Sequence, residues 1–71
     1  MTFPDRLKSL RVERGLSQGQ LAKEVGVSKN LICGYESGRH DPTSFNLCCL
    51  ADALHVSMDY LYGRTDRRDV D

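Results

Sequence analysis

Cysteine and histidine are the residues of this chain best suited to metal or redox chemistry. The cysteines are Cys33, Cys48 and Cys49, and the histidines are His40 and His55. A structural zinc site usually takes four such ligands at recognisable spacings, whereas the two histidines here stand in separate predicted loops. An odd number of cysteines, two of them adjacent, is no disulfide framework and fits a reducing compartment. We therefore predict no metal site, with a thiol redox switch as the open alternative.

His40, Asp41 and the serines of the chain are the residue types of a hydrolytic site. No pattern holds a nucleophile, a base and an orienting group together. A chain of 71 residues also buries too little surface to build a deep, water-free cleft easily. The sequence predicts one domain, no enzymatic activity and no cofactor.

Positive charge gathers in the first half of the chain. Residues 1–39 carry seven Lys and Arg against four Asp and Glu, a net charge of +3. Residues 40–71 carry three against six, a net charge of −3, so the whole chain is neutral. A basic half on a neutral chain is typical of a protein with one surface for a polyanion, although charges scattered over a solvated surface give the same totals. No apolar run approaches 18 residues and no signal-peptide pattern is present, so we expect a cytoplasmic protein without a membrane partner.

Five helical segments would position the polar residues, and each has its own start and stop signals. They are predicted over residues 5–14, 18–25, 29–37, from Thr43 to 54, and 58–62. Ser17, Ser28, Thr43 and Ser57 are the cap residues, and glycine follows four of the five segments. No strand pattern is present, so the sequence predicts an all-α fold.

The second and third segments are separated only by a short turn at Gly26, which is typical of a helix-turn-helix. Ser17 and Gln20 form a capping-box pattern at the start of the first of the two helices. In such a motif the first helix crosses the DNA backbone and the second enters the major groove. The predicted partner is therefore double-stranded DNA.

Residues 6–64 resemble the phage-repressor and Cro type (Xre-like) of helix-turn-helix protein. The shared residues are Gly15-Leu16-Ser17-Gln18, Leu21-Ala22, Val25-Gly26-Val27-Ser28, Ile32, Tyr35-Glu36-Ser37-Gly38-Arg39, Pro42, Leu47, Leu50-Ala51-Asp52-Ala53-Leu54 and Val56-Ser57-Met58-Asp59-Tyr60-Leu61. The resemblance implies a compact five-helix, lambda-repressor-like DNA-binding domain over residues 1–64, followed by a short charged tail over 65–71. Because charges alternate from Arg64 to Asp71 with one apolar residue among them, we expect this tail to fray. The resemblance further implies a transcriptional regulator, a repressor, that binds a roughly palindromic operator as a homodimer.

The resemblance also assigns roles to individual residues. The base contacts implied for the third helix come from Lys29, Asn30, Cys33 and Gly34. The implied phosphate contacts come from Gln18, Ser28, Ser37 and Arg39. Arg11 and Glu36 match a structural ion pair of the family. Val56, Tyr60 and Tyr62 match a dimer surface, although the tyrosines would equally serve to cover the core.

Several residues depart from the family pattern. Gly34 stands where relatives often carry Asn or Gln, Leu31 where a small or polar residue faces DNA, and Asp41 adds a negative charge near the expected phosphates. Cys48 stands at a usually apolar position and is expected to be buried, whereas Cys49 stands where Lys is common and is expected to be exposed. These departures keep a second hypothesis open, in which the same fold is a protein-interaction or antitoxin-like module with weak DNA contact.

Overall fold

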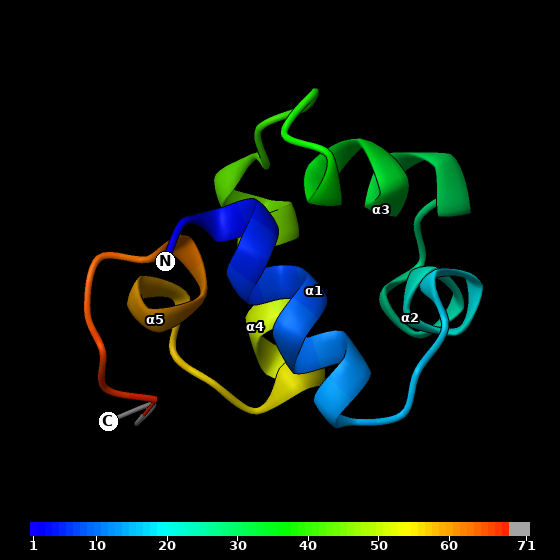
Figure 1. Cartoon of the computed structure of the whole chain (residues 1–71). Helices are drawn as coiled ribbons and strands as arrows, with labels where there is room; N and C mark the ends of the chain where they lie inside the picture. Colours follow the sequence, from blue (N-terminus) through cyan, green and yellow to red (C-terminus); the bar gives the residue numbers. More distant parts are fainter. Residues whose placement is uncertain (69–71) are drawn as a thin grey trace.

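The computed structural model describes residues 1–68, which form five helices and no strand (Figure 1). The helices are α1 (Phe3–Glu13), α2 (Gln18–Val25), α3 (Lys29–Glu36), α4 (Ser44–Leu54) and α5 (Met58–Tyr62). The predicted all-α, five-helix fold is confirmed. Among the described residues no helix is long and apolar enough to cross a bilayer.

Side-chain caps fix where four of the helices begin. The cap residues predicted for α2 to α5 each accept a hydrogen bond from the backbone amide three residues on, at 3.0–3.1 Å. At α2 the capping box is complete, because the Ser17 amide also donates to Oε1 of Gln20 at 2.8 Å. These bonds satisfy amides that have no partner within the helix.

The first helix begins two residues earlier than predicted, at Phe3. Pro4 lies in its first turn, where the missing amide hydrogen is not needed and the fixed φ suits a helix. The longer helix brings the ring of Phe3 into the core, 5.8 Å from the ring of Tyr35. This contact joins the start of α1 to the end of α3.

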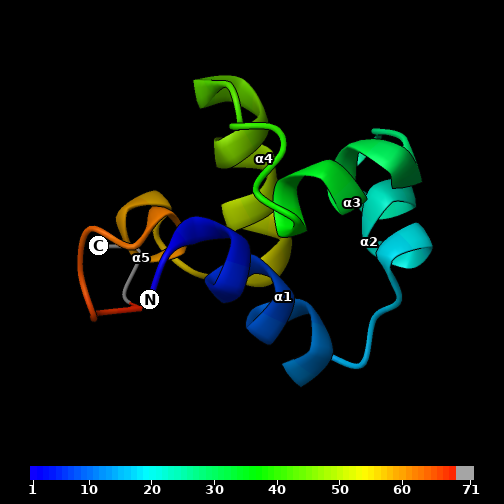
Figure 2. The same cartoon turned by 45° about the horizontal axis from the view of Figure 1, so that its top comes forward.

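The core is one cluster of twelve buried side chains drawn from all five helices and one loop. Its members are Phe3, Leu7, Leu10, Leu21, Ala22, Ile32, Tyr35, Leu50, Ala51, Leu54, Val56 and Leu61. Figures 1 and 2 show α5 on one side of the domain and α2 and α3 on the other, and between them α1 packs on α3 and α5 while α4 packs on α2 and α5. This packing holds α3 at the edge of the domain.

The segment after α5 is bonded back onto the domain as far as residue 68. Arg6, buried in α1, donates to the carbonyl oxygens of Tyr60 at 3.0 Å and Thr65 at 2.7 Å. Arg68 donates to both carboxylate oxygens of Glu13 at 2.7 and 3.1 Å. The prediction that the tail frays is therefore wrong for residues 65–68, and residues 69–71 lie outside the described part of the chain.

Candidate nucleic-acid interface

The turn between α2 and α3 sets the angle at which the two helices meet. Gly26 has a φ of 80°, a left-handed conformation that favours glycine, and its amide donates to the carbonyl of Ala22 at 2.9 Å. Val27 is half-buried against the core. Ala22 and Ile32 are buried in that core, and α2 packs closely on α3. The result is a compact helix-turn-helix, with α3 along one edge of the molecule (Figure 1).

The outward side of α3 carries polar side chains. Lys29, Asn30 and Cys33 are exposed, whereas Ile32 and Tyr35 of the same helix are buried. Positions i, i+1 and i+4 lie on one side of an α-helix. Three of the four residues predicted to contact bases therefore share one open face of α3.

The residues predicted to contact phosphates flank this face. Ser28 caps α3, and its hydroxyl accepts from the Leu31 amide at 3.1 Å. Ser37 follows α3 and donates its hydroxyl proton to the carbonyl of Gly34 at 3.1 Å, and Arg39 is exposed in the next loop. Gln18 opens α2, so it lies at the positive end of that helix.

An ion pair fixes α3 to α1. Nε of Arg11 lies 2.6 Å from Oε2 of Glu36, and Nη2 lies 3.0 Å from Oε1. The two side chains are only 12% and 5% exposed. The hydrogen bond to Glu36 is the main cause that raises the pKa of Arg11 above its usual value. Gln18 donates to the same Oε1 at 3.2 Å, so one carboxylate connects α1, α2 and α3.

A direct base contact by Gly34, which the sequence predicted, is contradicted by the structure. Gly34 is buried because the imidazole of His40 covers it, and a Cβ built on Gly34 would collide with Cδ2 of that ring. The amide of His40 also donates to the Gly34 carbonyl at 3.1 Å. The sequence did not predict a role for His40. Its only indication was Gly34, a glycine within α3 that stands six residues before this imidazole.

The three residues predicted to form a dimer surface have different environments. Val56 is 4% exposed and lies in the core, so its assignment to a surface is wrong. The Tyr60 ring is covered by the guanidinium groups of Arg6 at 4.0 Å and Arg68 at 5.4 Å. Tyr62 alone is open, at 38% exposure.

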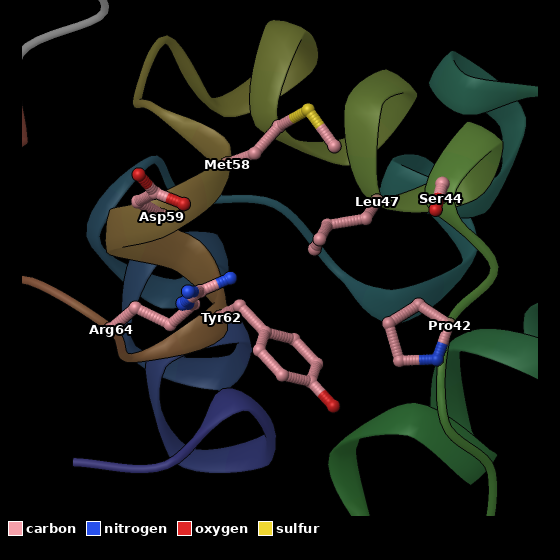
Figure 3. A pocket seen from close by; sticks show the side chains of 7 residues that line it. All are labelled: Pro42, Ser44, Leu47, Met58, Asp59, Tyr62 and Arg64. Carbon is pink, nitrogen blue, oxygen red and sulfur yellow. The ribbon is translucent and has the colours of Figure 1, made fainter.

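The Tyr62 hydroxyl donates to the Asp41 carboxylate, 3.1 Å from each of its oxygens. This hydrogen bond raises the pKa of Tyr62, because it stabilises the protonated phenol. Tyr62 also lines an open pocket of about 340 Å³ between α4 and α5, together with Pro42, Leu47 and Met58 (Figure 3). Phe45, at 76% exposure, follows Ser44 of the same pocket.

The two adjacent cysteines are placed opposite to expectation. Cys48 is exposed and Cys49 is half-buried. The reason is that Glu24 and Val25 of α2 flank Cys49, whereas Cys48 points away and its thiol lies 4.0 Å from the Asp52 carboxylate. Among residues 1–68 no group of three or more His, Cys, Asp or Glu is arranged to hold a metal ion.

Comparison with known proteins identifies the class of this domain. The family described as helix-turn-helix matches residues 7–61, so the chain belongs to the helix-turn-helix family. Its resemblance to phage repressors and Xre-type regulators, predicted from the sequence, is confirmed.

Two curated relatives are phage proteins. The chain is 42% identical to the cryptic phage CTXphi transcriptional repressor RstR of Vibrio cholerae, over 90% of this chain and 57% of that protein. It is 33% identical to the immunity repressor protein of Bacillus phage phi105, over 89% of this chain and 44% of that protein. The chain thus spans about half the length of these relatives.

Among solved structures, the P22 c2 repressor in complex with a synthetic operator is similar to the whole domain. The TM-score is 0.86 and the identity 32%, over 92% of this chain and 98% of that one. The lambda-repressor-like architecture predicted from the sequence is therefore confirmed.

Proposed function

We propose that this chain is a sequence-specific DNA-binding domain of a transcriptional regulator that acts as a repressor. The observation that carries the proposal is the exposed polar face of α3, with Lys29, Asn30 and Cys33, held rigidly by the helix-turn-helix and the buried Arg11–Glu36 pair. The similarity to a repressor solved with its operator supports the same conclusion.

Bases are contacted by the side chains of α3. Asn30 can pair through two hydrogen bonds with adenine, and Lys29 can donate to the acceptors of guanine. Cys33, one turn after Lys29 and Asn30, adds a small contact on the same face. The major groove admits one α-helix. With α3 in the groove, this face lies against the edges of a few base pairs.

Phosphates are contacted from both sides of α3. The first amides of α2, at Gln18, and the capped start of α3, at Ser28, favour an anion because helix amides point outward there. Arg39 supplies a positive charge in the loop beyond, beside Ser37. These contacts fix the register of the helix on DNA without selecting a sequence.

We infer that two copies bind one operator and that the protein acts in the cytoplasm without enzymatic activity. A two-fold dimer places its recognition helices about 34 Å apart, one turn of DNA. Val56 and Tyr60 are covered, whereas Phe45 and Tyr62 are exposed and Tyr62 borders the pocket between α4 and α5, so these two rings offer apolar surface to a second copy. The domain directs the whole protein to particular genes only through the base sequence that it prefers.

Two observations favour a second function, a protein-interaction or antitoxin-like module with weak DNA contact. Phe45 is 76% exposed, and Asp41 adds a negative charge in the loop after α3. An exposed ring beside a pocket is suited to a protein partner.

Salt dependence of binding to a duplex distinguishes the two functions. With Arg39 of two copies on phosphates, these two contacts should contribute about 2 to the slope with which log Kd rises with log salt. Arg39→Ala should lower the slope by about 2, because two phosphates lose their cation. A folded protein that shows no duplex binding at about 100 µM in low salt would instead support the interaction module.

A further inference from the structure

We propose that His40 supplies the base contact for which Gly34 has no side chain, so that a loop residue completes the recognition face of α3. The inference rests on the proposed DNA binding and names a specificity residue for it. The imidazole would donate a hydrogen bond to an acceptor on the major-groove edge of a purine.

The position of the ring follows from the geometry of α3. Gly34 comes four residues after Asn30, so the two positions lie one above the other on one side of the helix. The His40 ring occupies the space where a side chain at position 34 would begin, with Cγ and Nε2 only 3.1 and 3.2 Å from a Cβ built there. His40 thereby stands in line with Asn30.

The ring is held there by the backbone. The amide of His40 donates to the Gly34 carbonyl at 3.1 Å, and the Ser37 hydroxyl donates to the same carbonyl oxygen at 3.1 Å. The start of the loop is thereby fixed to the end of α3, from which Figure 2 shows the loop leading to α4. A side chain held in this way loses little freedom on binding.

The ring nitrogens are available to a ligand. His40 is exposed although one side of its ring lies on Gly34, and within residues 1–68 neither ring nitrogen makes a hydrogen bond. A neutral imidazole has one donor and one acceptor, and the protonated form has two donors. Purine N7 and guanine O6 are acceptors in the major groove. Arg39, the preceding residue, faces the phosphates in the proposed function, which brings the His40 backbone close to DNA.

The test compares base preference in wild type and His40→Ala. Each base pair of the duplex that the wild type selects from a random pool is replaced in turn, and Kd is measured for both proteins. The wild type should lose about 5- to 100-fold in affinity on replacement of one purine per half-site. His40→Ala should bind all duplexes at that position alike and keep its preference elsewhere.

Two further variants separate a base contact from a role in folding. Gly34→Ala should lose the same preference, because its Cβ displaces the ring, and Gly34→Ala/His40→Ala should match His40→Ala, because the collision is gone. The control is His55→Asn, at the other end of α4, about 16 Å along that helix. It removes the second imidazole and should change no preference. Thermal unfolding is followed for every variant.

The outcomes are distinct. If His40→Ala keeps the full wild-type preference, or loses affinity equally on every duplex, His40 does not contact a base and the inference is overturned. If Gly34→Ala unfolds, the double variant still decides, because it relieves the collision. If folded wild type selects no duplex at all, the proposed function fails and this inference fails with it.

Discussion

Arg11 of α1 and Glu36 of α3 form a two-pronged ion pair, with Nε and Nη2 of the guanidinium at 2.6 and 3.0 Å from the two carboxylate oxygens. The third nitrogen, Nη1, donates to the Leu16 carbonyl at 2.8 Å, and Gln18 donates to Glu36. The pair therefore links α1, the loop before α2, α2 and α3. This ion pair holds α3 in place, although its two side chains are largely buried.

Removal of one partner should destabilise the domain more than removal of both. Glu36→Met leaves unpaired a guanidinium that is only 12% exposed, and we expect a loss of about 3 kcal/mol in the free energy of unfolding. Arg11→Met/Glu36→Met leaves no charge behind and should lose less. Urea denaturation of wild type, both single variants and the double variant measures the difference. A double variant that loses the sum of the two single effects would contradict this description of the pair.

Replacement of one base contact and of one phosphate contact should have different signatures. Asn30→Ala should cost about 1–3 kcal/mol on the selected duplex and remove preference at a single base pair. Arg39→Ala should weaken binding to all duplexes alike and reduce its salt dependence. Fluorescence anisotropy with labelled duplexes measures both. If the two variants lose affinity uniformly, Asn30 does not contact a base.

The helices could be predicted from the sequence because local chemistry marks their ends. Ser17 with Gln20, Ser28, Thr43 and Ser57 are caps in the structure as predicted, and Gly26 takes the left-handed conformation that its place after α2 suggested. These signals depend on residues three or four apart, so a single sequence contains them.

Features that depend on contacts distant in sequence could not be predicted. The burial of Cys49 rather than Cys48 depends on where α2 crosses α4, and the order of the tail depends on Arg68 reaching Glu13, 55 residues away. The His40 ring over Gly34 depends on the path of a loop. For the candidate interface, the exposed residues Lys29, Asn30 and Cys33 of α3 could be predicted from the sequence. The position of His40 over Gly34 could not.

Thiol reactivity should report which face of the domain meets DNA. Cys33 and Cys48 are both exposed in the free protein, one on α3 and one on α4, and Cys49 is half-buried. We expect Cys33 and Cys48 to react with a thiol reagent before Cys49. Bound to the selected duplex, Cys33 should become slow to react and Cys48 should not. Single-cysteine variants measured with and without duplex provide the assay. Equal protection of both thiols, or of Cys48 alone, would move the interface away from α3.

The ion pair between Glu13 and Arg68 should contribute stability only above acidic pH. The hydrogen bond from Arg68 is the main cause that lowers the pKa of Glu13 in the folded protein. A carboxylate whose pKa is lower when folded stabilises the fold above its unfolded pKa, and this contribution is lost as the pH falls through the folded value. The melting temperature of Glu13→Gln should therefore lie slightly below wild type at neutral pH, and the difference should shrink as the pH falls through the folded pKa of Glu13.

Two controls belong to this measurement. Glu24→Gln changes an exposed glutamate of α2 that makes no ion pair within residues 1–68, and it should show no such pH dependence. High salt should shrink the Glu13 effect, because the pair is exposed and screened. A difference that persists unchanged to pH 3 would mean that Glu13 acts through packing rather than charge.

Selection of bound duplexes from a random pool at about 0.15 M salt tests whether this domain binds DNA by sequence, because the salt suppresses non-specific binding. We expect an enriched motif with two-fold symmetry, whose half-sites lie about one helical turn apart, bound by two copies of the protein. The same protein with Lys29→Ala and Asn30→Ala should fold and lose the enrichment at the base pairs that these two residues contact. If protein shown to be folded enriches no motif, the domain does not recognise DNA by sequence on its own, and the proposed function is contradicted.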